Sequence, residues 1–311
     1  MSLWIILATV GQLLNAIVVF IDKFLVSDEK ALPKPFVYAF YSSLLTGFWV
    51  FIYFLGYIPF LSDIGAPSME NIQKPTIQVL GMCFLAAYTL FMALVSMYTA
   101  LKKAEADNVI PVIGTISALS TLGMSYLFLD ITLTSNFIWG IVVLSLGTLL
   151  VAQTLPKRDV VLSVVHSGVF FGLHFITMKG LFLETNFDDG FFWSRICFVL
   201  FALSLLMVPT YYEKITSQTK GTSKKTGMIV ILAKVLAGIA AFLILKATDL
   251  GDVAVVQALD GLKFLFILLI SIAFGSMLPD CITKHKPSEK EIRRRVLYVS
   301  VITVGYFILF L

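Results

Sequence analysis

The sequence predicts an all-α integral membrane protein of ten transmembrane helices, arranged as two inverted five-helix repeats. Composition is the first observation: of 311 residues, 59% are hydrophobic and 14% are charged, whereas soluble domains have roughly 45–50% apolar and about 25% charged residues. The second is that the apolar residues form continuous runs of helix length, which alternating barrel strands do not. The third is that ten such runs divide into five and five. This composition excludes an ordinary soluble enzyme, a disordered chain and a secreted disulfide scaffold.

The first five apolar runs are separated by proline and polar residues. The run at 3–24 has no basic leader and no small-residue cleavage site, so we expect it to remain as a membrane helix. Pro33 and Pro35 precede the second run, and Pro75 precedes the third. A spanning helix needs about 20 apolar residues. The expected spans of the first half are 3–24, 36–55, 76–100, 107–128 and 134–153.

The second five runs follow the same pattern. Pro156 precedes the sixth run, residues 216–226 are polar and lysine-rich, and residues 279–295 form the largest polar segment. The last run is the shortest, with 17 residues. The expected spans of the second half are 160–182, 189–209, 227–247, 252–274 and 295–311.

The two halves share a short sequence pattern. Residues 100–113 (ALKKAEADNVIPVI) align with residues 244–257 (ILKATDLGDVAVVQ), and both lie where the third and fourth spans of their half meet. Lys23 and Lys179 each lie near the end of the first span of their half. An odd number of spans in each half inverts the second half relative to the first. The sequence therefore predicts two domains, residues 1–155 and 156–311.

Basic residues gather in loops 1–2, 3–4, 5–6, 7–8 and 9–10. The positive-inside rule places such loops in the cytoplasm and, with ten spans, both termini outside. The expected location is the cell (inner) membrane. The opposite side has three basic residues, Lys74, Lys179 and Lys246, against 17 on the basic side: Lys23, Lys30, Lys34, Lys102, Lys103, Lys157, Arg158, Lys214, Lys220, Lys224, Lys225, Lys284, Lys286, Lys290, Arg293, Arg294 and Arg295.

Charged residues inside the expected spans indicate a solute site, because an ionisable group near the bilayer centre costs about 2.5–3.5 kcal/mol and normally faces protein or water. Asp260 and Lys263 lie three residues apart near mid-depth, as a proton or substrate site or as a structural pair. Arg195 can hold a carboxylate or phosphate by two hydrogen bonds. For Lys234 the alternative is snorkelling to the membrane surface, and for Arg195 it is snorkelling or hydrogen bonding to backbone carbonyls. The excess of positive charge predicts a substrate with an anionic group, such as an amino acid or organic acid.

Uncharged polar residues complete the expected site. Gln12 and Asn15 share a helix face, where they line a cavity or bond neighbouring helices. His174 lies midway along the sixth span and either exchanges protons or bonds another helix. We therefore expect proton coupling at Asp260 and His174, and no metal or cofactor. The expected substrate-binding residues are Gln12, Asn15, Tyr88, Arg195, Lys234, Gln257 and Lys263.

Five short motifs are distributed along the chain: Asn15…Ile21–Asp22–Lys23–Phe24–Leu25, Ala100–Leu–Lys–Lys–Ala–Glu–Ala with Val109–Ile–Pro111, Leu127–Phe–Leu–Asp130, Gly140…Gly147, and Ala247–Thr–Asp–Leu–Gly–Asp–Val253. With these motifs the chain resembles EamA-like ten-span members of the drug/metabolite transporter superfamily over nearly its whole length. This resemblance implies a secondary transporter, an exporter driven by proton antiport, that works by alternating access. It also implies that spans 1–4 and 6–9 form the cavity and that spans 5 and 10 support it.

Two other classes of function stay open. A lipid flippase or lipid-phosphate-handling protein would use the basic side to hold headgroups. A membrane scaffold would transport nothing. The sequence has no phosphate-binding glycine loop, HExxH or GxSxG motif, so we expect no enzyme. The expected partners are a small-molecule substrate and membrane lipid but no nucleic acid, and a homodimer is left open.

Overall fold

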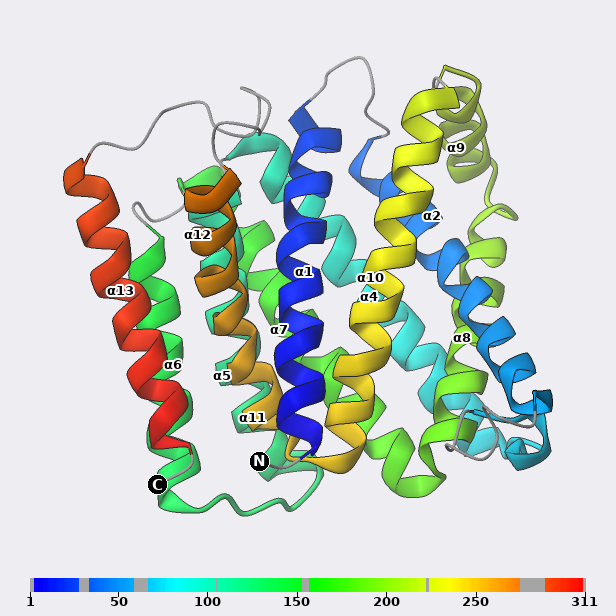
Figure 1. Ribbon diagram of the computed structural model, residues 1–311. Coiled ribbons are helices and arrows are strands. Elements are labelled where there is room, and N and C mark those ends of the chain that lie inside the picture. The colour runs from blue at the N-terminus through cyan, green and yellow to red at the C-terminus, as the bar shows by residue number, and fades with distance from the viewer. Residues whose placement is uncertain are drawn as a thin grey trace.

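The computed structural model describes residues 3–27, 34–58, 67–104, 106–152, 157–221, 224–274 and 289–309. Its described residues form helices packed side by side, without a strand (Figure 1). Helix α1 begins and helix α13 ends at the same edge of the bundle, at the bottom of the view. Lys30, Lys284 and Lys286 of the orientation argument, and the predicted domain boundary at 155/156, lie outside the described residues.

The first half begins with one long helix and then a helix of mixed type. Pro35 is the first residue of α2, a position that tolerates proline because its missing N–H would have no helical partner. The chain continues from α2 directly into the 3-10 helix η1. The elements are α1 (Leu3–Ser27), α2 (Pro35–Leu45), η1 (Thr46–Tyr57), η2 (Met69–Asn71), α4 (Ile77–Lys103), α5 (Ala106–Phe128) and α6 (Ser135–Val151).

The second half contains two interruptions that the apolar pattern does not reveal. Helices α8 and α9 meet at an angle of 99°, so the seventh predicted span ends at Leu205. The predicted helix at 252–274 is three pieces, with the 3-10 turn η3 between α11 and α12. The elements are α7 (Arg158–Glu184), α8 (Phe187–Leu205), α9 (Pro209–Gly221), α10 (Lys224–Leu250), α11 (Val253–Ala258), η3 (Leu259–Gly261), α12 (Leu262–Phe274) and α13 (Glu289–Ile308).

Six described helices are long and apolar enough to cross a membrane, or seven if the bent pair α8–α9 is one span. Helix α6 and the apolar part of α13 are shorter. Every predicted range contains helix, and these lengths and compositions are those of an integral membrane protein. The count of ten spans stays a prediction. The six are Leu3–Asp22, Pro35–Tyr57, Ile77–Lys103, Asn108–Phe128, Arg158–Glu184 and Gly227–Leu250.

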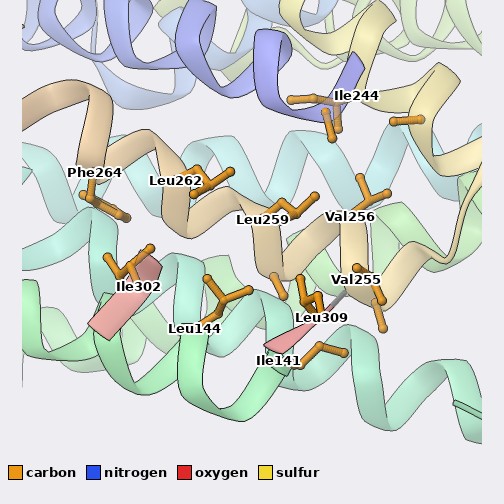
Figure 2. Packing of buried hydrophobic residues seen from close by; sticks show 14 of the residues in the cluster. Ile141, Leu144, Ile244, Val255, Val256, Leu259, Leu262, Phe264, Ile302 and Leu309 are labelled. Carbon is orange, nitrogen blue, oxygen red and sulfur yellow. The ribbon is translucent and has the colours of Figure 1, made fainter. Parts of the chain in front are cut away.

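Helices α6 and α13 form a closely packed pair at one side of the bundle (Figure 1). Three glycines allow the approach: a Cβ at Gly140 would meet Leu309, one at Gly147 would meet Ile302, and one at Gly305 would meet Leu144. Small residues serve this purpose in membrane helix pairs. Figure 2 shows the resulting core, in which Leu144 and Ile302 lie beside Leu259 of the broken helix. This core holds η3, and therefore Asp260, in place.

The remaining helices pack around the middle of the bundle. The most extensive contacts pair α4 with α7, α1 with α10, and α5 with α7. The α11 helix lies against α5, and α12 lies against α1. Helices of the two halves are therefore interleaved instead of forming two separate bodies.

Candidate solute site

A cavity of about 270 Å³ lies between helices of both halves. Its lining residues come from α1, α2, η1, α4, α5, α7, α8, α10 and the broken helix α11–η3–α12, and none of the described lining residues comes from α6 or α13. The described lining residues therefore fall in the first four and in the sixth to ninth of the ten predicted ranges. Eight of the nine predicted site residues line it: Gln12, Asn15, His174, Arg195, Lys234, Gln257, Asp260 and Lys263.

Tyr88 is the ninth predicted residue, and it is not among the lining residues. Its side chain is 44% exposed and its ring lies near those of Phe170 and Phe201. Leu90 and Leu94 show which face of α4 lines the cavity. At 100° per residue, position 88 is about 200° from position 90. Tyr88 therefore points away from this cavity, and its role in substrate binding stays a prediction.

Arg195 is a buried guanidinium without a carboxylate partner among the described residues. It is 3% exposed, its Nε donates to Ser194 Oγ at 3.4 Å, and its buried Nη2 has no hydrogen-bond partner. The rings of Phe191 and Phe198 lie 4.7 and 4.6 Å from its Cζ. These cation–π contacts come from positions one helical turn away on α8, so they fix the guanidinium without using its donors. A buried charge normally has a partner, so Arg195 has donor capacity that none of the described residues uses.

Asp260 and Lys263 form the pair that their spacing predicts. Lys263 Nζ lies 2.8 Å from Oδ1 and 2.7 Å from Oδ2 of Asp260. The carboxylate approaches α5 at Gly114, where a Cβ would lie 2.9 Å from Asp260 Oδ2. Lys263 therefore does not snorkel, and its charge is neutralised within the cavity wall.

Lys234 has partners that spacing along the chain does not reveal. Its Nζ lies 3.4 Å from Asp22 Oδ1 and donates to Tyr98 Oη at 3.2 Å. Tyr38 Oη donates to the same Asp22 oxygen at 2.5 Å, and its ring lies 4.1 Å from Lys234 Nζ. The ion pair joins α1 to α10. Lys234 therefore faces protein in this cluster, and the snorkelling alternative is wrong for it.

The uncharged polar residues make helix contacts at the cavity wall. His174 Nδ1 lies 3.0 Å from the Ala86 carbonyl oxygen. Because a carbonyl only accepts, Nδ1 carries the hydrogen, and in the neutral ring Nε2 is an acceptor. Ser117 Oγ donates to Gln257 Oε1, and Asn15 Nδ2 donates to Gln12 Oε1. The helix-bonding alternative is thus realised for His174, which also lines the cavity, whereas Gln12 and Asn15 bond each other on one helix.

Sequence reasoning missed one part of the wall. Trp49 lines the cavity, and the sequence does not single it out as a binding residue. The Trp49 indole rests on α10 at Gly238, where a Cβ would lie 1.7 Å from its Nε1. In the sequence, the signal for such a close approach is a glycine in an otherwise apolar helix. That glycine does not show which aromatic residue packs against it.

The balance of charge follows from these contacts. Five of the described lining residues have carboxylate, ammonium or guanidinium side chains: Asp22, Lys234, Arg195, Asp260 and Lys263. Four of them form two pairs. The excess of positive charge that the sequence predicts is therefore concentrated on Arg195.

Comparisons with known proteins bear on the fold alone. No protein-family model and no curated protein matches the sequence. Chains of solved structures do match, 28 of them. A crystal structure described only as that of a protein is 14% identical and superposes with a TM-score of 0.62, over 97% of this chain and 95% of that one. The chain thus shares, over nearly its full length, the fold of a solved structure.

Proposed function

We propose that this protein is a secondary active transporter that exports a small metabolite with an anionic group. The observation that carries the proposal is the cavity of about 270 Å³ with charged side chains in its wall, set among apolar helices of both halves. Burying charges in such a bundle is costly, so their convergence on one cavity favours a polar solute there. The volume is near the lower end of about 300–1,000 Å³ for ligand pockets, which fits a small metabolite.

The packing of the helices supports two related halves and alternating access between them. Numbered in the order of the ten predicted spans, α4 is third, α7 sixth, α1 first and α10 eighth. Two five-helix repeats would relate each helix to the one five places away, so α4 corresponds to α10 and α7 corresponds to α1. The contact of α4 with α7 then corresponds to the contact of α10 with α1, and both contacts are present. The α6–α13 contact maps onto itself. This pattern is the one expected of the inverted repeats found in many secondary transporters, including the drug/metabolite superfamily that the sequence resembles.

Proton coupling is assigned to Asp260, with His174 as the second candidate. Asp260 lies on a 3-10 turn in the broken helix and borders the cavity. Interrupted helices carry the substrate and ion sites of many transporters. Protonation of Asp260 would release Lys263, so solute and proton binding would be linked through the charge of one pair.

The test is exchange of a pool of metabolites in proteoliposomes, followed by mass spectrometry, with wild type and Asp260→Asn. We expect wild type to move one class of anionic compounds and to accumulate it against a gradient when a pH difference is applied. Asp260→Asn should lose the response to the pH difference. If folded wild type moves nothing at any pH difference, the transporter proposal is wrong, and labelled lipids are the next pool.

The basic loops are proposed to face the cytoplasm of the cell (inner) membrane, with both termini outside. Helix α1 begins and α13 ends at one edge of the bundle (Figure 1), as an even number of crossings requires. Reporter fusions at the two ends test this orientation. We expect a periplasmic reporter to be active at both ends. Activity of a cytoplasmic reporter at both ends would show that the orientation is reversed, while the number of membrane crossings would still be even.

A further inference from the structure

We propose that the solute is a monocarboxylate with an apolar body and without an ammonium group. This inference rests on the proposed function and specifies the substrate class. Among the described residues of the cavity wall, one positive charge has no acidic partner, that of Arg195, because the two lysines are paired with Asp22 and Asp260. The cavity wall can therefore neutralise one charge of the solute. Because the group without an acidic partner is a guanidinium, that charge is negative.

Arg195 offers a carboxylate a site built in advance. The guanidinium is 3% exposed, its Nη2 is buried without a partner, and two phenyl rings hold its Cζ. A planar guanidinium matches the two oxygens of a carboxylate with two parallel hydrogen bonds. The buried, unpartnered donor is the feature that points to a ligand, since a polar group left unsatisfied in the interior is unfavourable.

The charges of the cavity wall also disfavour solutes that are dianions or zwitterions. A dicarboxylate or phosphate monoester would bring a second negative charge for which the wall has no free cation among the described residues. The ammonium of an amino acid would need a carboxylate, and the two in the wall already hold lysines. Much of the remaining wall is aliphatic or aromatic, including Val18, Leu94, Ile113, Phe171 and Phe175. These surfaces favour an apolar body.

The test measures binding to the purified full-length protein with probes that differ by one charged group. 3-Phenylpropanoate is compared with L-phenylalanine and phenylsuccinate, and 4-methylpentanoate with L-leucine and isopropylsuccinate. We expect the monocarboxylate of at least one series to bind about tenfold or more tightly than its two partners, by calorimetry. No detectable monocarboxylate binding in either series, or equal or tighter binding of the zwitterion or dianion, overturns the inference.

Variants test whether charge balance is the cause. Asp260→Asn leaves Lys263 unpaired in the cavity, so affinity for phenylsuccinate should rise about tenfold. Asp260→Asn/Lys263→Met should lose that gain. The matched control is Asp249→Asn, which breaks a second Lys–Asp pair of the same spacing, Lys246–Asp249 at 2.9 Å, away from the cavity lining and should not change the affinity. Equal gains in Asp260→Asn and Asp249→Asn, or no gain in Asp260→Asn, contradict the charge argument.

Binding and flux separate the two proposals. Preference for a monocarboxylate without exchange across proteoliposomes would preserve the ligand class and overturn transport. Exchange of dicarboxylates, phosphate esters or amino acids in preference to monocarboxylates would preserve transport and overturn the ligand class.

Discussion

Trp49 and Gly238 show how one missing side chain shapes the cavity. The indole of Trp49 occupies the space that a Cβ on α10 would need, with its Nε1 1.7 Å from the Cβ position. Because that ring is bulky and lies in the cavity wall, it must move when a methyl group is added. The wall at this point therefore depends on a glycine.

Gly238→Ala should lower the stability of the protein by about 1–3 kcal/mol, the usual cost of overpacking. The measurement is the thermal midpoint in detergent. Gly227→Ala is the control on the same helix, because nothing lies within 4 Å of its Cβ position and alanine is the better helix former. Equal midpoints for the two variants would show that Trp49 does not rest on α10 at Gly238.

Some contacts in the candidate site can be predicted from the sequence, and others cannot. Spacing along one helix predicts the Asp260–Lys263 pair, because positions three apart are neighbours. It does not reveal that Lys234 pairs with Asp22, since 212 positions separate them. Arg195 is conspicuous in an apolar run, but its lack of a carboxylate partner becomes visible only when the surrounding helices are in place.

At the scale of elements, Lys179 fixes the end of α10. Its Nζ donates to the carbonyl oxygens of Thr248, Asp249 and Gly251, each at 2.9 Å. The last carbonyls of a helix have no partner within the helix, so a buried ammonium serves as a cap supplied by α7. The sequence counts Lys179 among the loop charges, whereas the structure buries it to 8% exposure. Its charge is therefore a helix cap and not a marker of the outer surface.

Lys179→Met should destabilise the protein by about 1–3 kcal/mol, because buried carbonyls lose their donor. Thermal denaturation in detergent measures this loss, and proteolysis between α10 and α11 should become faster. Lys214→Met is the comparison, since Lys214 lies on an exposed face of α9 and exposed charges contribute little. A midpoint for Lys179→Met within error of that for Lys214→Met would contradict the capping role.

The limits of prediction differ among elements. Apolar runs locate all ten helical ranges, because continuous hydrophobicity is a strong signal. They do not show the bend after Leu205 or the 3-10 turn Leu259–Gly261. The expected span 252–274 passes through η3. At Gly261 this element packs closely against α6, since a Cβ there would lie 2.5 Å from Thr148 Oγ1. Contacts of this kind, between residues far apart in the sequence, are not visible in the apolar pattern.

At the scale of the whole molecule, the two halves surround one cavity. Helices α6 and α13 stand apart as a pair held by glycines, while helices of both halves contribute the lining. The Asp22–Lys234 ion pair connects α1 of the first half to α10 of the second. The cavity thus depends on how the halves sit against one another, as alternating access would require. The two halves are interleaved because helices far apart in the sequence contact each other. The short pattern shared by residues 100–113 and 244–257 indicates these contacts only weakly.

We propose that a solute crosses the membrane only when its anionic group reaches Arg195. Exchange of the metabolite pool is measured with wild type, Arg195→Lys and Arg195→Met, each normalised to folded protein in the proteoliposomes. We expect Arg195→Met to abolish exchange of every anionic compound that wild type moves. Arg195→Lys should retain a small fraction, because an ammonium keeps the charge but lacks the planar pair of donors. Undiminished exchange of the same anions by folded Arg195→Met would show that Arg195 does not bind the solute.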